Sequence, residues 1–143
     1  MNKILSLAFL ILIAVASKAQ SPSITFKDTM QYHMGTFKQG EVAEHVFEFT
    51  NTGNGVLKIK EVRTTCSCTA SEWPKTAIAP GQKGSIKVTF DTHDKLGEYA
   101  KGVNIFSNAG ESNLIIIVNV VKNDKPVPRP HKEIIDHSGH DHD

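Results

Sequence analysis

Cysteine is scarce in this sequence, and its scarcity limits how the fold can be stabilised. The 143 residues contain two cysteines, Cys66 and Cys68, with a single residue between them. Cysteines this close in the chain cannot tie distant segments together, so a disulfide-stapled scaffold is excluded. The fold must therefore be held by a hydrophobic core, for which roughly 100 residues suffice.

Long apolar runs are also missing. The longest, from Ile4 to Ala16, covers 13 residues, whereas a membrane-spanning helix needs about 20. A basic residue precedes this run and small residues follow it up to Ala19, which is the pattern of a secretory signal peptide. We expect residues 1–19 to be a signal peptide, the protein to be exported to the periplasm or the extracellular space, and no membrane insertion after signal removal.

Neither sign of charge dominates. The chain has 16 basic and 15 acidic residues, and without Lys3 and Lys18 of the expected signal peptide the balance is 14 − 15 = −1. A net charge this close to zero argues against nucleic acid and against an anionic membrane surface as partners. Among catalytic motifs, there is no Gly-rich phosphate loop, no Gly-x-Ser-x-Gly elbow and no His-Glu-x-x-His pair. We expect no catalytic residues and no enzymatic activity.

What the sequence does contain is alternation of apolar and polar residues between Ile24 and Val121. Phe47 and Phe49 alternate with polar neighbours, and so do the apolar residues between positions 86 and 90. A period of two is the signature of a strand, because successive side chains point to opposite faces. The run 114–121 is the most apolar and is typical of a strand that is covered on both faces.

Turn-forming residues separate these runs. We expect a tight hairpin at 51–55, where glycine and asparagine tolerate positive φ, and further turns at 79–81 and 108–110. About seven short strands at this spacing predict an all-β fold, an immunoglobulin-like antiparallel β-sandwich over residues 20–122.

The motifs that separate and end these strands resemble those of a bacterial family, the domain of unknown function 1573. The shared elements, in order, are Phe47-x-Phe49-x-Asn51-Thr52-Gly53, Leu57-x-Ile59, Cys66-Ser67-Cys68, Trp73, Ala79-Pro80-Gly81, Gly84-x-Ile86-x-Val88-x-Phe90 and Ser107-Asn108. The resemblance implies an exported immunoglobulin-like domain, related in fold to the major sperm protein and to modules of ciliary proteins, and it implies no particular activity. The usual family form has glycine between the cysteines, where this chain has Ser67.

The two cysteines leave several alternatives open. Residues two apart in a regular strand have Cα atoms about 6.6 Å apart, whereas a disulfide prefers about 5.5–6 Å, so a bridge would require a bend. Both cysteines could instead pack in the core, or remain reduced and ligate copper or zinc. A third ligand would then come from His33, His45, His93 or the C-terminal tail.

The composition changes after residue 122. Residues 123–143 hold three of the six prolines and four of the seven histidines, including His137, His140 and His142. Alternating prolines favour an extended chain, so we expect a flexible His-rich tail outside the sandwich. Histidines this close can bind zinc or copper; the alternative is a solubilising tail that meets metal incidentally.

These patterns favour a non-catalytic binding or structural module of the bacterial cell envelope. Its partner would be another envelope protein, held through strand edges or loops. The alternative is a periplasmic copper- or zinc-binding protein with Cys66, Cys68, His137, His140 and His142 as ligands. The lone tryptophan, Trp73, is expected to pack at the end of the sandwich or, if exposed, to stack on a ligand.

Overall fold

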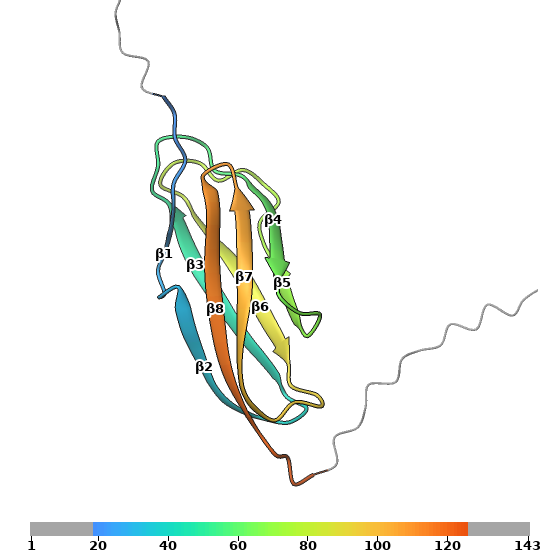
Figure 1. Cartoon of the computed structure of the whole chain (residues 1–143). Coiled ribbons are helices and arrows are strands. Elements are labelled where there is room, and N and C mark those ends of the chain that lie inside the picture. Colours follow the sequence, from blue (N-terminus) through green and yellow to red (C-terminus); the bar gives the residue numbers. More distant parts are fainter. Residues whose placement is uncertain (1–18, 126–143) are drawn as a thin grey trace, which may run out of the picture.

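The fold was obtained as a computed structural model, which describes residues 19–125. This part of the chain contains eight β-strands and no helix, so the expectation of an all-β domain is confirmed (Figure 1). The strands are β1 (Ile24–Phe26), β2 (Gln31–Lys38), β3 (Val42–Asn51), β4 (Ile59–Thr64), β5 (Thr69–Glu72), β6 (Lys83–Asp91), β7 (Gly97–Ser107) and β8 (Gly110–Val121). Most of the expected signal peptide and of the His-rich tail lies outside the described residues.

The eight strands form two four-stranded sheets packed face to face, which confirms the sandwich. One sheet has the order β1-β3-β6-β5 and the other the order β2-β8-β7-β4. The pairing is antiparallel except between β2 and β8, which are parallel. This pair arises because the chain passes from β1 to β2 without a hairpin and joins the second sheet beside β8 (Figure 1). Within residues 19–125 no helix could cross a membrane.

Alternation along the strands builds the core, as the sequence predicts. Phe47 and Phe49 of β3 point inward and are 0% and 1% exposed. Val46, the residue before Phe47, points outward and is 42% exposed. The other sheet contributes inward side chains from β7 and β8. The fully buried apolar residues of the two sheets include Ile86, Val88, Phe90, Val103, Ile105, Leu114, Ile116 and Val118. Burial of this contiguous apolar surface stabilises the domain in the absence of long-range disulfides.

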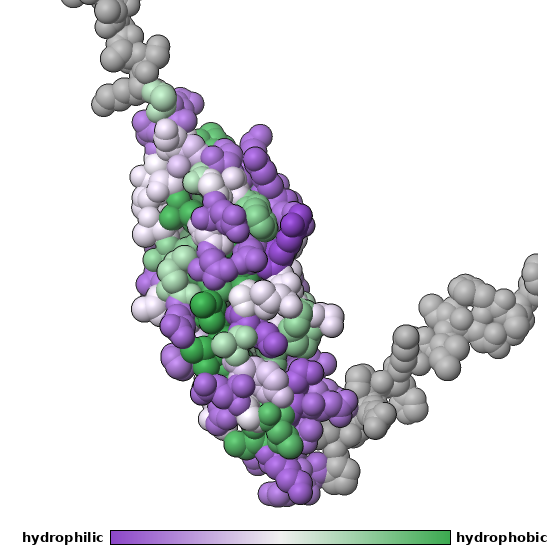
Figure 2. Space-filling model, in the orientation of Figure 1, coloured by the Kyte–Doolittle hydropathy of each residue, from purple (hydrophilic) through white to green (hydrophobic). Residues whose placement is uncertain are grey.

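One expectation about β8 is wrong. The strand is covered on its inner face only: Leu114 and Ile116 are buried, whereas Ile115 and Ile117 between them are half-buried. β8 lies inside its sheet, with β2 and β7 as neighbours, but no described element packs on the sheet's outer face. Figure 2 shows this face, on which apolar patches lie between polar side chains. An apolar run in an antiparallel sandwich therefore does not require burial on both sides.

The segment 51–55 is not a hairpin, which corrects a second expectation. It carries the chain from β3 in one sheet to β4 in the other. Asn51, fully buried, organises this crossover. Its side-chain nitrogen donates to the carbonyl oxygens of Gly55 at 2.8 Å and Ile78 at 3.0 Å. Its side-chain oxygen accepts from the amides of Gly53 at 3.1 Å and Ser23 at 3.3 Å.

The glycines of this crossover are required for a reason other than positive φ. A Cβ atom at Gly53 or Gly55 would collide with the backbone of residues 20–23, which runs against the crossover. The other two predicted turns have the expected geometry. Gly81 has φ 78° and Gly110, which closes the turn between β7 and β8, has φ 107°, values that glycine adopts without a Cβ penalty.

Candidate functional site at the β4–β5 edge

Two open strand edges and the loop between them lie on one side of the sandwich. β4 is hydrogen-bonded only to β7, and β5 only to β6, so each ends its sheet. Residues 65–68 connect them, and the two strands lie side by side (Figure 1). Unpaired backbone groups at such edges are available to another chain.

The cysteines lie in this connecting loop and form a disulfide with each other. The chain leaves β4 at Thr64 and enters β5 at Thr69, so neither cysteine is in a strand. Their Cα atoms are 5.3 Å apart, closer than the spacing of about 6.6 Å in a regular strand. Of the alternatives that the sequence leaves open, the structure has the local bridge, together with the bend that the bridge requires.

The loop is held by hydrogen bonds that do not involve the bridge. The Thr64 hydroxyl donates to the carbonyl oxygens of Cys66 at 3.2 Å and Thr69 at 2.9 Å. The amide of Thr69 donates to the Cys66 carbonyl at 3.2 Å, and the amide of Asp91 donates to the Cys68 carbonyl at 2.8 Å. These contacts fix the backbone on both sides of Ser67.

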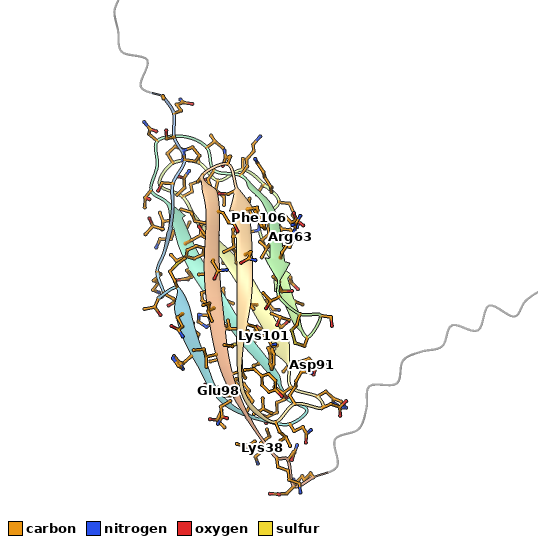
Figure 3. The ribbon with its side chains drawn as sticks, in the orientation of Figure 1. Lys38, Arg63, Asp91, Glu98, Lys101 and Phe106 are labelled. Carbon is orange, nitrogen blue, oxygen red and sulfur yellow. A yellow bond between two sulfur atoms is a disulfide. The ribbon has the colours of Figure 1, made fainter. Side chains whose placement is uncertain are left out.

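The two sulfur atoms have different surroundings. The Cys66 sulfur lies 3.4 Å from the hydroxyl oxygen of Thr69, a residue that is 4% exposed. Cys68 packs against the hydrophobic core while remaining partly exposed. Asp91 of β6 and Lys101 of β7 carry opposite charges on the strands that flank this loop (Figure 3).

A hollow of about 370 Å³ lies next to β5, on the outer face of its sheet. It is lined by Val46, Glu72, Trp73, Pro74, Ser85 and Lys87. Trp73 is half-buried and packs against the core, and its indole nitrogen is buried with no hydrogen-bond partner among the described residues. The Lys75 ammonium lies over the indole ring, a favourable cation–π arrangement.

The hydrogen-bond pattern shows which backbone groups of β5 are free. Because the Asp91 amide bonds to Cys68, the alternation of an antiparallel ladder places Ala70 and Glu72 in bonded pairs with β6. The amide and carbonyl of Ser71 then point away from β6, toward the open edge. The carbonyl of Thr69 also points away from β6, but the Thr64 hydroxyl occupies it.

The basic trio of Lys58, Lys60 and Arg63 is exposed on or beside β4. Arg63 donates to the Glu61 carboxylate at 2.8 Å and lies over the Phe106 ring (Figure 3). The hydrogen bond lowers the pKa of the Glu61 carboxyl and raises that of Arg63. An exposed cation that is paired with a neighbouring carboxylate belongs to a solvated strand surface. This agrees with the nearly balanced charge of the sequence, which argues against a nucleic-acid or anionic-membrane partner.

The proposed metal ligands are not brought together in the described part of the chain. Cys66 and Cys68 are joined to each other, and a disulfide offers no thiolate. His137, His140 and His142 lie outside the described residues. Between residues 19 and 125, no three His, Cys, Asp or Glu side chains form a group that could hold a metal ion.

Of the histidines considered as a third ligand, His45 has other side-chain partners. His45 hydrogen-bonds to Asp28 at 3.0 Å and stacks on Tyr32, with ring centroids 3.6 Å apart, on the β1–β2 side of the sandwich. The backbone amide of His93 donates to the Asp91 carboxylate in the turn after β6. A metal site that includes the cysteines would require the bridge to be reduced first.

The sequence pattern does not identify Thr64, Thr69, Ser71 or Val46 as parts of a site. Threonine and valine are ordinary strand residues, and nothing in their local pattern distinguishes an open edge from a paired strand. The fold assigns Thr64, Thr69 and Ser71 to the site because β4 and β5 end their sheets on the same side. Val46 of β3 belongs to it because it lines the hollow beside β5.

Solved structures from bacteria and from human are similar in fold to this chain. A protein of unknown function from Porphyromonas gingivalis W83 is 18% identical with a TM-score of 0.62; the match covers 75% of this chain and 50% of that protein. The ASH/PapD-like domain 7 of human CEP192 is 12% identical with a TM-score of 0.62, covering 78% of this chain and 94% of that one. The secreted serine protease VesC from Vibrio cholerae is 15% identical with a TM-score of 0.51, covering 72% and 24%.

At these identities the similarities establish the fold alone, and this chain spans about half of the first structure. No curated protein matches the sequence significantly. The family described as "Protein of unknown function (DUF1573)" matches residues 24–121, the whole of the sandwich from β1 to β8. The chain therefore belongs to the DUF1573 family, as the motifs around Asn51, Cys66 and Gly81 indicate.

Proposed function

We propose that this protein is an exported, non-catalytic binding module of the bacterial cell envelope that holds an extended segment of another envelope protein at the β4–β5 edge. The observation that carries the proposal is the open edge of β5 beside a hollow lined by Val46, Trp73 and Pro74. Unpaired backbone groups at a sheet edge can pair with an extended segment of another chain.

The hollow also offers apolar surface. Val46 is 42% exposed at its wall, and Pro74 follows the half-buried indole. An apolar side chain of the partner would remove this surface from water. Tryptophan, which combines a large apolar area with one polar group, is the residue type that most often dominates binding energy at interfaces.

The open edge of β5 determines how a bound segment would lie. A partner strand beside β5 would pair with the amide and carbonyl of Ser71, the groups that point away from β6. Main-chain pairing contributes affinity, and the pocket next to it contributes selectivity for a side chain. The partner segment would therefore be extended and would place one apolar residue near Trp73.

Export and the envelope location rest on the N-terminal sequence, with its basic start and short apolar run. Similar folds in larger chains are consistent with a modular role, since the match to the secreted protease VesC covers only 24% of that protein. Such sandwiches occur as parts of longer proteins.

Site-specific photocrosslinking in intact cells tests the proposal. A photoreactive residue at Ala70, exposed on β5, is compared with one at Thr25, exposed on β1 at the opposite edge of the same sheet. We expect one discrete envelope protein to be captured from position 70 and not from position 25. Equal capture from both positions, or none from position 70, would contradict the proposal.

Two variants sharpen this experiment. Trp73→Phe keeps an aromatic ring but reduces the apolar surface at the hollow, and Ser71→Pro removes an amide that β6 does not use. Both should reduce the crosslinked product while circular dichroism stays unchanged. Ile117→Ser, on the outer face of the other sheet, serves as the matched control and should leave capture intact.

A further inference from the structure

The Cys66–Cys68 bridge contributes little to holding the fold. A disulfide stabilises mainly by constraining the unfolded chain, and the effect grows with the length of the closed loop. This bridge encloses a single residue, Ser67. The Thr64 hydroxyl and the amides of Thr69 and Asp91 already fix the same loop. The turn therefore retains its shape with or without the sulfur–sulfur bond, and a structural role leaves the pair of cysteines unexplained.

The bridge is also accessible from outside. Both cysteines are partly exposed, and Thr65 and Ser67 beside them are exposed. The loop lies where β4 and β5 have no further strand neighbours. An attacking thiolate can thus approach the sulfur atoms without opening either sheet, and access is one of the conditions for thiol–disulfide exchange.

The buried Thr69 hydroxyl distinguishes the two sulfur atoms. It lies 3.4 Å from the Cys66 sulfur and is placed to donate to a thiolate there. Hydrogen bonds to a charged group favour the charged form. A sulfur that leaves more readily as a thiolate is the better leaving group in exchange. Cys66 is therefore the leaving sulfur, and Cys68, held by the core and by Asp91, is the sulfur that is attacked.

We propose that Cys66 and Cys68 form a redox-exchange site that takes two electrons from a dithiol of another protein. A thiolate of the partner attacks the Cys68 sulfur, the Cys66–Cys68 bond breaks, and its electron pair leaves on Cys66, which then takes up a proton. The second thiolate of the partner then attacks the partner sulfur that is bonded to Cys68 in the mixed disulfide. That step releases Cys68 as a thiolate, which is protonated. The partner dithiol is oxidised to a disulfide, and the bridge is reduced to two thiols.

This inference does not depend on the binding role proposed above, because it uses the loop sulfurs and not the Trp73 hollow. Thr69 acts as a positioning residue that works through Cys66. After reduction the same turn keeps the two thiols adjacent, so the reverse reaction restores the bridge without a search through chain conformations.

Equilibration of the folded protein with glutathione buffers tests the proposal. Structural disulfides of exported proteins resist reduction by glutathione. We expect this bridge to become half-reduced within such buffers while near-ultraviolet circular dichroism and the melting temperature stay close to those of the oxidised protein. A reduced peptide with a Cys-x-x-Cys pair should be oxidised by one equivalent of bridged protein. A bridge that opens only at the rate of global unfolding would overturn the proposal.

Variants at position 69 separate chemistry from structure. Thr69→Val removes the hydroxyl and should slow exchange about tenfold, the effect of one hydrogen bond to a charged atom, and it should raise the pKa of the Cys66 thiol in the reduced protein. Thr69→Ser should restore both values. Thiolate absorbance against pH measures that pKa, which a purely structural role would leave unmoved. If Thr69→Val is folded and exchanges at the wild-type rate, the assigned role is wrong.

Discussion

The side-chain nitrogen of Asn51 lies 3.0 Å from the carbonyl oxygen of Ile78, a residue 27 positions later in the chain. Asn51 makes three further side-chain hydrogen bonds, to Gly55, Gly53 and Ser23, and so satisfies backbone groups of several segments at one end of the sandwich. The Ile78 carbonyl is shared, because it also accepts from the Leu57 amide. The N-terminal segment, the crossover after β3 and the segment before β6 therefore meet at one buried amide.

The first prediction concerns this amide. Asn51→Ala should lower the free energy of unfolding by about 3 kcal/mol, because it leaves several backbone donors and acceptors without partners. Chemical denaturation measures the effect. Asn54→Ala is the control, since Asn54 is exposed and its side chain accepts only from the Ser21 amide. Equal losses in the two variants would show that Asn51 does not organise the crossover.

The second prediction concerns Gly53. Alanine there should lower the free energy of unfolding by about 2 kcal/mol, a typical cost of overpacking, because the added Cβ collides with the backbone of Ser21 and Ser23. The same substitution should cost less in a chain that lacks residues 20–23, since the colliding backbone is then absent. Thermal melting of the single and combined variants checks both expectations.

The third prediction concerns pH. The Lys27 ammonium donates to the Glu48 carboxylate at 2.9 Å, and this hydrogen bond lowers the pKa of Glu48 and raises that of Lys27. Because the pKa of Glu48 is lowered by folding, the stabilisation is present at neutral pH and is lost as the pH falls through the folded value. Both side chains are largely exposed, so the effect on stability is small.

Lys27→Met should move the pKa of Glu48 up toward its ordinary value, because the donor and the positive charge are both removed. A nuclear magnetic resonance titration of the Glu48 carboxyl carbon measures this shift directly. Lys87→Met is a useful comparison, since Lys87 pairs with Glu44 instead. If Glu48 titrates identically in wild type and Lys27→Met, the pair does not form in solution.

The fourth prediction concerns metal. Only the reduced protein offers two thiolates at Cys66 and Cys68, so it should bind about one equivalent of copper(I) under anaerobic conditions. The bridged protein should bind none through these sulfurs. A chain ending at Lys125 separates the contribution of His137, His140 and His142 from that of the cysteines. Tight copper(I) binding by the bridged, truncated chain would rule out both groups as the ligands.

Much of the fold could be predicted from local pattern. Alternation at Phe47 and Phe49 identified a strand and its buried face, and Ala79-Pro80-Gly81 identified a turn with a left-handed glycine. β2 was harder to recognise: its pairing with β8 shifts register between His33 and Gly35, and a bulge interrupts the period of two on which such predictions depend.

The candidate site was predictable only in part. The spacing of Cys66 and Cys68 indicated that a bridge between them would need a bend, and the loop between β4 and β5 contains one. Whether the sulfurs would join, pack separately or meet a histidine depends on contacts that spacing does not contain. The importance of Ser71 depends on hydrogen-bond alternation against β6, which is set by pairing between segments distant in the chain.

The amino-acid sequence by itself determined that this domain is a β-sandwich with a core built from alternate residues, because side-chain direction in a strand is a local property of the backbone. Tertiary structure alone decided that residues 51–55 cross between sheets, that β2 runs parallel to β8, and that β4 and β5 present open edges beside Trp73. These features depend on which strands pair, and strand pairing is decided by the burial of apolar surface over the whole domain rather than by neighbours in the chain.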